Sequence, residues 1–133
     1  MIDSIIFDVD GTLWDSTDTV ARAWNRILEQ KTDLKPTLTG DTLKGLFGRL
    51  LPDIAAVIFE KYPRERQLEL IDLCCEEEHR ELLAHPAPVY DTLEETLRIL
   101  SGKYLYILSA TARQAILRYF FRPQASAVIF RTT

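Results

Sequence analysis

The sequence lacks several features that mark common classes of protein. It has no window approaching the roughly 18 apolar residues of a membrane span. Its N-terminus has no charged segment followed by an apolar one, as a secretory leader would have. The 20 Asp and Glu residues outnumber the 16 Lys and Arg residues, and the net charge is −4 with no basic cluster. These absences argue against membrane, secreted and nucleic-acid-binding proteins, so we expect a cytoplasmic location.

Cysteine and histidine are also scarce, which limits metal and redox chemistry. The two cysteines, Cys74 and Cys75, are adjacent within a helical pattern, a poor start for a disulfide framework or a zinc site. The two histidines, His79 and His85, lie in the same pattern. A lone histidine on a helix is more often a surface or packed residue than a catalyst. We therefore expect reduced cysteines and no catalytic histidine.

The sequence does contain enough apolar material for a folded domain, and one distinctive segment near its start. Of the 133 residues, 47% are hydrophobic and 27% are charged, as in a globular domain that buries a core. Residues 5–7, Ile-Ile-Phe, form a short apolar run that predicts a strand buried on both faces in a parallel sheet. Asp8 and Asp10 follow, and alternate residues of a strand point the same way, so we expect their carboxylates to converge.

Two converging carboxylates at the end of a strand favour a cation site. Asp8 and Asp10 repel each other unless a cation lies between them, and hard oxygen ligands in a mostly hydrated site suit Mg²⁺. Gly11 and Thr12 then offer backbone N–H groups in a tight turn, an arrangement that binds anions. The segment therefore predicts a site for a metal and a phosphate. The plainer alternative, a turn with two solvated aspartates, does not explain the apolar run that leads into the pair.

Residues 8–13, Asp-Val-Asp-Gly-Thr-Leu, resemble motif I of the haloacid dehalogenase superfamily, whose phosphatases carry Asp-x-Asp-Gly-Thr-Leu after the first core strand. The resemblance implies that Asp8 is the nucleophile and forms an aspartyl-phosphate. It implies that Asp10 acts first as general acid and then as general base. It also implies that Mg²⁺ is held by the Asp8 side chain and the Asp10 backbone carbonyl.

The next part of the chain predicts a helical insertion. Apolar residues spaced three and four apart from Val20 to Leu28 indicate an amphipathic helix, with its N-cap within residues 15–17. Three further helices are expected after a loop at 31–41, over residues 42–51, 52–62 and 64–85.

The longest of these helices, 64–85, has an apolar stripe and an acidic segment. Its acidic residues 76–78 are most simply a solvated surface. The stripe consists of Leu68, Ile71, Cys75, Leu82 and Leu83. Earlier in the insertion, Arg49 has two open interpretations: it grips a second anionic group of a substrate, or it is exposed to solvent.

The segment after the insertion predicts a return to the first strand. Two prolines in residues 86–89 make a stiff, extended connector. Asp91 is expected to cap a helix that ends at Ser-Gly, residues 101–102. Residues 104–108 then predict a second buried strand, which terminates at Ser109.

This order of elements predicts an α/β fold with a partial Rossmann-like core and a parallel sheet. We place the core at 1–14 and 86–133 and an inserted all-helical cap at 15–85. The arrangement resembles the superfamily members whose cap follows motif I, a group that includes phosphoglycolate phosphatases and β-phosphoglucomutases. In the family, the second core strand ends in Ser or Thr, whose hydroxyl binds the transferring phosphoryl group. The resemblance implies this role for Ser109.

The resemblance breaks after Ser109. Ala110 stands where the family often has Asn, and the family's third motif, a Lys, and fourth motif, an acidic cluster, have no counterpart. Lys103 precedes the second strand and therefore does not match the Lys of the third motif. Residues 114–121 indicate a further helix. Our hypothesis is that residues from about 110 onward are read out of frame, and that the normal product of the gene is longer than this truncated chain.

The leading functional prediction is a Mg²⁺-dependent phosphatase of small phosphorylated metabolites, of the phosphoglycolate or sugar phosphate type. We expect its activity to be impaired in this chain, because the missing Lys and acidic groups would stabilise charge on the phosphoryl oxygens. One alternative is a phosphosugar mutase of the same superfamily. Another is a non-catalytic helical interaction module that binds a partner through the stripe of 64–85.

Overall fold

The computed structural model describes residues 2–8 and 10–109 of the chain, with the backbone alone for 105–109. The chain divides into two compact units. One unit is formed by Met1–Ser16 with Pro86–Thr133, and we call it the strand unit. The other is Thr17–His85, and we call it the helical unit. The predicted assignment of 1–14 and 86–133 as a catalytic core, and of 15–85 as its cap, stays a prediction.

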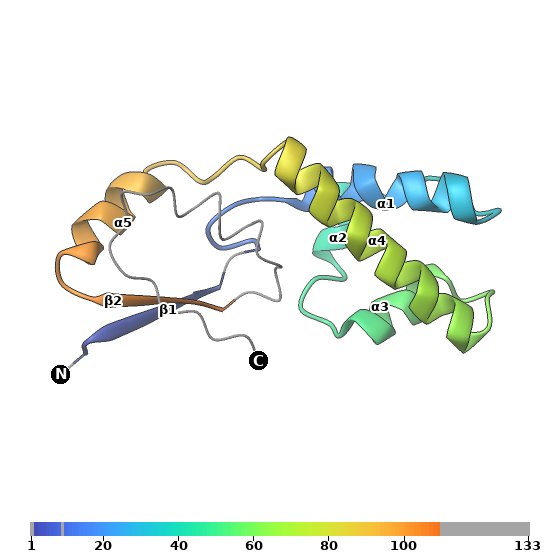
Figure 1. The fold of residues 1–133 in the computed structure, drawn as a ribbon, viewed down its shortest axis with the longest axis horizontal. Coiled ribbons are helices and arrows are strands. Elements are labelled where there is room, and N and C mark those ends of the chain that lie inside the picture. The colour runs from blue at the N-terminus through green and yellow to red at the C-terminus, as the bar shows by residue number, and fades with distance from the viewer. Residues whose placement is uncertain (1, 9, 110–133) are drawn as a thin grey trace. The chain divides into compact units, whose positions relative to one another are not determined.

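The strand unit contains two parallel strands and one helix. Strand β1 (Ser4–Asp8) and strand β2 (Leu105–Ser109) pair in parallel, and helix α5 (Leu93–Ser101) precedes β2 (Figure 1). The register runs from Ser4 opposite Leu105 to Asp8 opposite Ser109. Both predicted strands are confirmed, as is their parallel pairing. The sheet of the described residues has two strands, so the larger Rossmann-like core stays a prediction.

The apolar side chains of the strand unit are only partly covered. Ile6, in the middle of β1, is 67% exposed, and none of the α5 residues is buried. The predicted burial of β1 on both faces is therefore wrong for Ile6. The physical reason is that, within the described part of the chain, β1 has a single neighbouring strand and the exposed face of Ile6 lacks a packed partner layer.

Helix α5 begins later than predicted. Its N-cap is Thr92 and not Asp91, and the cap makes no side-chain hydrogen bond. Thr92 has a left-handed backbone with φ of 63°, which turns the chain sharply into the helix. The predicted end is confirmed, because Gly102 is the C-cap residue after Ser101. The helix predicted at 114–121 lies outside the described residues.

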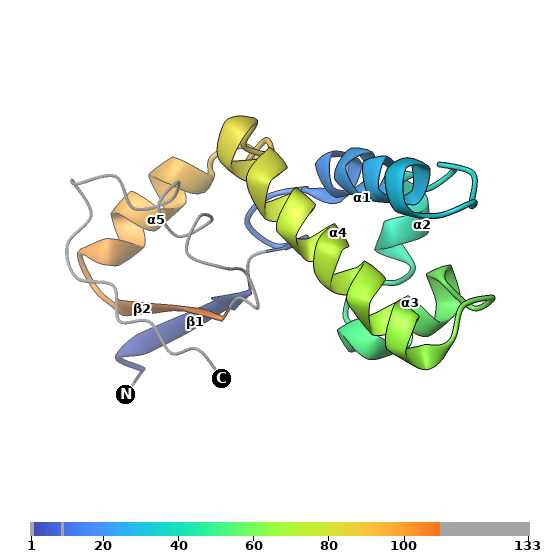
Figure 2. The same ribbon diagram turned by 45° about the vertical axis from the view of Figure 1, so that its right-hand side comes forward.

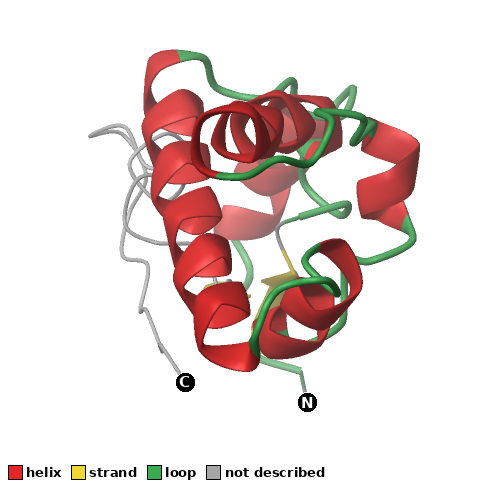
Figure 3. Ribbon diagram, turned by 90° about the vertical axis from the view of Figure 1, so that its right-hand side faces the viewer, coloured by secondary structure: helices red, strands yellow, loops and turns green. Residues whose placement is uncertain are grey.

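The helical unit is built from four helices (Figure 3). They are α1 (Thr17–Lys31), α2 (Gly40–Lys44), α3 (Leu51–Ile58) and α4 (Arg64–Ala84). Helix α4 packs against α1 and α3, and α1 also packs against α2 (Figures 1 and 2). Among the described helices, none combines the length and apolar character that crossing a membrane would need.

The helices enclose one apolar core. Each fully buried large side chain contributes about 1.5–3 kcal/mol relative to its exposed state. The most deeply buried core members are Val20, Trp24, Leu43, Phe59, Leu70, Ile71 and Cys74. Burial raises the pKa of the Cys74 thiol far above its ordinary value, with smaller contributions from Cys75 and Glu78. Cys74 therefore serves as a packed side chain and is a poor thiolate.

The second predicted helix, 42–51, is wrong in its extent. Helix α2 begins after Thr39, whose Oγ1 accepts a hydrogen bond from the Thr42 N–H at 3.1 Å, and it ends at Lys44. Gly48 has φ of 91°, a left-handed backbone that a continuous helix cannot contain. The following helix, α3, has Pro52 in its first turn as predicted.

The buried face of α4 differs from the predicted stripe. Of the predicted members, Ile71 and Leu82 are buried, whereas Leu68 is 38% and Leu83 is 52% exposed. A polar residue, Gln67, takes a core position because its side-chain amide donates to the carbonyls of Phe59, at 3.2 Å, and Tyr62, at 3.0 Å. Apolar spacing alone could not assign the face correctly, since one of its core residues is not apolar.

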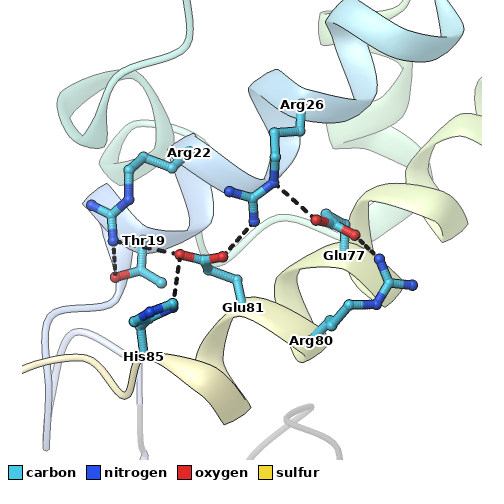
Figure 4. A network of polar contacts seen from close by, with 7 residues as sticks. All are labelled: Thr19, Arg22, Arg26, Glu77, Arg80, Glu81 and His85. Atoms are coloured by element: carbon cyan, nitrogen blue, oxygen red, sulfur yellow. Dashed lines mark hydrogen bonds and ion pairs between the residues drawn. The ribbon is translucent and has the colours of Figure 1, made fainter.

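The acidic segment of α4 fixes α4 to α1 and is only partly a solvated surface. Arg26 Nε donates to Glu77 Oε1 at 2.9 Å, and its Nη2 contacts Glu81 Oε2 at 2.5 Å (Figure 4). Arg80 pairs with the same Glu77. Trp24 Nε1 donates to Glu78 Oε2 at 2.9 Å. The predicted solvation therefore holds for Glu76 and is wrong for Glu77 and Glu78, because Arg26 pairs with Glu77 and Trp24 donates a hydrogen bond to Glu78.

Candidate active site

The first carboxylate of the candidate site lies at the end of β1. Asp8 is the last residue of that strand, and its side chain is exposed. Thr12 Oγ1 donates to Asp8 Oδ2 at 3.3 Å, near the upper limit for a hydrogen bond between oxygens. The Asp8 carboxylate therefore keeps lone pairs available for another partner.

The second carboxylate is held much more tightly. Asp10 is half-buried, and Trp14 Nε1 donates to its Oδ1 at 2.8 Å. Ser16 Oγ donates to the same oxygen at 2.9 Å. Trp14 and Ser16 are each only 1% exposed. Hydrogen bonds from sheltered donors to a charged acceptor are stronger than neutral ones, so the orientation of the Asp10 carboxylate is fixed.

The turn between these residues depends on a glycine. Gly11 has φ of 77°, in the left-handed region, and its N–H donates to the Trp14 carbonyl at 2.9 Å. This bond closes the turn that brings Trp14 back to Asp10. The Gly11 N–H is thus engaged within the turn, whereas within the described part of the chain the Thr12 N–H has no acceptor. A Cβ added at Gly11 would meet no atom of the described residues within 4 Å, so open space lies beside the turn in this part of the structure.

The turn is supported by the segment that returns from the helical unit. Asp15 N–H donates to the Pro88 carbonyl at 3.3 Å, and Tyr90 N–H donates to the Leu13 carbonyl at 3.2 Å. Trp14 and Val89 form an antiparallel bridge between these two bonds. We call residues 13–15 with 88–90 the linker ladder. The sequence predicted a stiff connector at residues 86–89, but it contained no signal that this connector pairs with residues 13–15.

The two strands bring the remaining predicted residue to the same edge of the sheet. Ser109 is the last residue of β2 and is the register partner of Asp8. Because β1 and β2 are parallel, both residues lie at carboxyl ends of strands, where α/β folds place their ligands. The contacts of the Ser109 hydroxyl lie outside the described side chains.

Two of the site's residues were missed by the sequence analysis. Trp14 was not assigned a role, and Ser16 was included only among the possible N-cap positions of the first helix. Their contacts with Asp10 arise from the turn at Gly11, which brings residues four and six positions later back to one oxygen. The only signal in the sequence was that Trp14 and Ser16 each have a side chain that can donate a hydrogen bond.

The donor set suits a hard divalent cation. Asp8 contributes an exposed carboxylate, and Asp10 contributes a carboxylate and a backbone carbonyl, which are oxygen ligands of the kind that Mg²⁺ prefers. Within residues 2–8 and 10–109, no group of three or more His, Cys, Asp or Glu side chains could hold a metal. Mg²⁺ usually keeps several waters and needs only one or two carboxylates from the protein, so the residues present fit it.

The other candidate, Arg49, lies in the helical unit. It is exposed, and its backbone N–H donates to the Leu46 carbonyl at 3.2 Å. Among the described residues, no carboxylate pairs with its guanidinium. The interpretation that Arg49 is exposed to solvent is therefore confirmed, and its role in binding a second anionic group stays a prediction.

Comparison with known protein families gives a match over nearly the whole chain. The model of the haloacid dehalogenase-like hydrolase family matches residues 2–130, nearly the whole chain. No curated protein gives a significant match. The matched range includes residues after 109, so the hypothesis that these are out of frame stays a hypothesis.

Two solved structures show the likeness in the fold. A predicted phosphatase from Clostridium acetobutylicum has a TM-score of 0.67 and 21% identity over 90% of this chain. A haloacid dehalogenase superfamily hydrolase of subfamily IA, variant 1, from Geobacter sulfurreducens has a TM-score of 0.62 and 18% identity over 97% of this chain. The chain spans 56% and 62% of their respective lengths. On the match of its family model, the chain belongs to the haloacid dehalogenase-like hydrolases.

Proposed function

We propose that this chain carries the nucleophile and the acid–base residue of a Mg²⁺-dependent phosphatase of small phosphorylated metabolites. The observation that carries the proposal is the contrast between two carboxylates at one strand end. Asp8 is exposed and lightly held, as a nucleophile must be. Asp10 is oriented by two buried donors, as a proton-transfer group must be.

In the proposed reaction, an Asp8 carboxylate oxygen attacks the phosphorus of a phosphate monoester. The bond between phosphorus and the ester oxygen breaks, and Asp10 donates a proton to the leaving alcohol. Asp10 then removes a proton from a water molecule, which attacks the aspartyl-phosphate on Asp8. Phosphate leaves, and Asp8 returns to a carboxylate while Asp10 is again protonated.

The phosphoryl group needs donors around it throughout this sequence. We assign this role to Gly11, Thr12 and Ser109, which lie beside or opposite Asp8. The Thr12 N–H points to this role most directly, because no described residue accepts it. Gly11 contributes by leaving open space next to the turn. Mg²⁺, bound by the Asp8 carboxylate and the Asp10 carbonyl, would neutralise charge on the phosphoryl oxygens.

The helical unit is proposed as the cap of this enzyme. A cap that excludes water strengthens every electrostatic interaction in the site and prevents loss of the reactive intermediate. The similar C. acetobutylicum protein is a predicted phosphatase, which is consistent with a phosphate ester as substrate. We propose phosphoglycolate or a sugar phosphate as that ester, because the resemblance is to subgroups that act on such compounds.

The test is phosphate release from a panel of esters, including phosphoglycolate and hexose phosphates, with and without Mg²⁺. The panel is run with this chain and with a version in which the neighbouring reading frame replaces residues from about 110 onward. We expect turnover that requires Mg²⁺ and is larger in the second protein. Asp8→Asn should abolish it, because the amide is not a nucleophile.

The matched control is Asp3→Asn, since Asp3 is an exposed aspartate that precedes β1. It should leave turnover unchanged. Sugar phosphate isomerised without free phosphate would favour the mutase instead. If no ester were consumed in either protein and Asp8→Asn behaved like the unaltered chain, the catalytic proposal would fail in favour of an interaction module.

A further inference from the structure

We propose that Trp14 is a positioning residue that locks the Asp10 carboxylate through its indole N–H. Trp14 Nε1 lies 2.8 Å from Asp10 Oδ1, and Ser16 Oγ lies 2.9 Å from the same atom. With both donors on Oδ1, the carboxylate has one preferred orientation, and Oδ2 is directed away from them. The inference rests on the proposed function only in assigning proton transfer to Asp10.

The position of the indole is itself determined by the backbone around it. Trp14 forms a parallel bridge with Asp10 and an antiparallel bridge with Val89. Its carbonyl accepts the Gly11 N–H. The side chain is 1% exposed, so it has no solvent-filled space in which to rotate. A rigid donor of this kind restricts its acceptor more than a flexible one does.

The Asp8 carboxylate is held less tightly than the Asp10 carboxylate. Its one described side-chain contact is with Thr12 Oγ1 at 3.3 Å, and the carboxylate is exposed. A rigid Asp10 beside an adaptable Asp8 gives one carboxylate with a fixed direction for its proton and one free to approach phosphorus. A mispositioned proton donor loses much of its effect on rate even where its chemistry is intact.

The chain contains a matched control for this contact. Trp24 is also buried, at 2% exposure, and its Nε1 also donates to a carboxylate, Glu78 Oε2, at 2.9 Å. It lies on α1 in the helical unit, which contains none of the residues assigned to catalysis. Replacing either tryptophan by Phe removes one indole N–H donor and keeps an aromatic ring in the core.

The first experiment measures the orientation of Asp10 in the full chain without any substrate. The three-bond couplings between its Hα and two Hβ atoms report the χ1 rotamer by NMR. In the unaltered chain we expect one large and one small coupling, as a single rotamer gives. In Trp14→Phe both couplings should move to the averaged, intermediate value, whereas in Trp24→Phe they should stay unchanged.

Either of two results in this experiment would overturn the proposal. One is averaged Asp10 couplings in the unaltered chain, a result that needs no variant to fold. The other is a single Asp10 rotamer in Trp14→Phe, provided that its amide spectrum shows a folded chain. Ser16→Ala separates the contribution of the second donor, and we expect it to broaden the rotamer distribution less than Trp14→Phe does.

The second experiment links the orientation to chemistry by changing the leaving group. An alkyl phosphate releases a strongly basic alkoxide and needs its proton, whereas p-nitrophenyl phosphate releases a weakly basic phenolate and does not. Trp14→Phe should lower kcat for the alkyl ester by about 10-fold or more, with little change for p-nitrophenyl phosphate and little change in KM. Equal losses on both esters would indicate a merely structural role and overturn the proposal.

Failure of the proposed function gives a different pattern. In that case the unaltered chain hydrolyses neither ester, or Asp8→Asn hydrolyses both at the original rate. The coupling measurement still decides whether Trp14 orients Asp10, because it does not depend on turnover. A locked Asp10 in an inactive protein would leave the positioning contact established and remove only its assignment to proton transfer.

Discussion

Asp8 and Ser109 are register partners at the carboxyl ends of two parallel strands. Residues from the two ends of the described chain are thereby brought to one edge of a sheet. The pairing involves the backbone, so it holds these two positions together independently of what either side chain binds. A site that needs a nucleophile and a hydroxyl donor on one phosphoryl group can use such an arrangement.

Ser109→Ala should lower the rate of phosphate release. The proposed hydroxyl donor to the phosphoryl oxygens is lost, and removing one donor to a developing negative charge typically lowers the rate about 100-fold. Ser109→Thr should retain most activity. The control is Ser101→Ala, because Ser101 Oγ donates to the Arg98 carbonyl at the end of α5. A rate for Ser109→Ala equal to that of the unaltered chain would remove Ser109 from the site.

Gly11→Ala should destabilise the strand unit through its backbone alone. The φ of 77° is unfavourable for a residue with a Cβ by about 1–2 kcal/mol. Within the described part of the chain, no atom lies within 4 Å of the added methyl, so the expected loss comes from the backbone conformation. Urea unfolding measures the loss. Gly102→Ala is the control, since Gly102 has φ of −75°, and a loss at Gly102 as large as that at Gly11 would contradict the explanation.

Gln67→Met should destabilise the helical unit although it makes the core more apolar. The Tyr62 carbonyl would lose the amide donor, whereas the Phe59 carbonyl would keep the Tyr62 N–H at 2.9 Å, and an unsatisfied buried polar group destabilises by about 1–3 kcal/mol. Thermal or urea unfolding measures the change. Gln30→Met, at an exposed position of α1, is the control and should be nearly neutral. A stabilised Gln67→Met would mean that the two hydrogen bonds contribute nothing net.

The ion pair between Arg26 and Glu81 should make stability depend on acid pH. The hydrogen bond from Arg26 lowers the pKa of Glu81 below its ordinary value of 4.5, and the side chain is only 13% exposed. A lowered folded-state pKa means that the stabilisation is complete above the ordinary value and is lost as pH falls through the folded-state value. Glu81→Gln should therefore lower the free energy of unfolding at pH 7, and the difference should shrink below about pH 4.5.

The control for this pH dependence is Glu76→Gln, because Glu76 is exposed on the same helix. It should show little difference from the unaltered chain at any pH. A destabilisation by Glu81→Gln that stays constant from pH 7 to below the folded-state pKa would assign the effect to packing and not to charge. Urea midpoints at a series of pH values distinguish these cases.

The elements with strong local signals were predictable from the sequence. Short apolar runs gave both strands, and three- and four-residue spacing gave α1 and α4 close to their observed bounds. The extent of α2 was not predictable: the helix ends at Lys44, and the left-handed φ of Gly48, which excludes a continuous helix to residue 51, cannot be read from a glycine in the sequence. The buried face of α4 was not predictable either, since it includes Gln67.

The candidate site was predictable where it depends on sequence neighbours and not where it depends on folding of a turn. Alternation along a strand is sufficient to suggest that Asp8 and Asp10 belong together. The contacts of Trp14 and Ser16 with Asp10 require the turn at Gly11 to reverse the chain, a property of the folded state. The contacts of Glu77 and Glu78 were not predictable for a similar reason, because their partners lie on a helix that is distant in sequence.

The linker ladder has a consequence for how such a protein is assembled from parts. Because Asp15 is hydrogen-bonded to Pro88, the chain leaves the strand unit and re-enters it at adjacent points. A segment whose two ends are already neighbours can be exchanged for a shorter or longer one at little cost in loop-closure entropy. The helical unit is thus an insertion between two neighbouring points of the strand unit, and exchanging it for another segment would leave the turn at Gly11 unchanged.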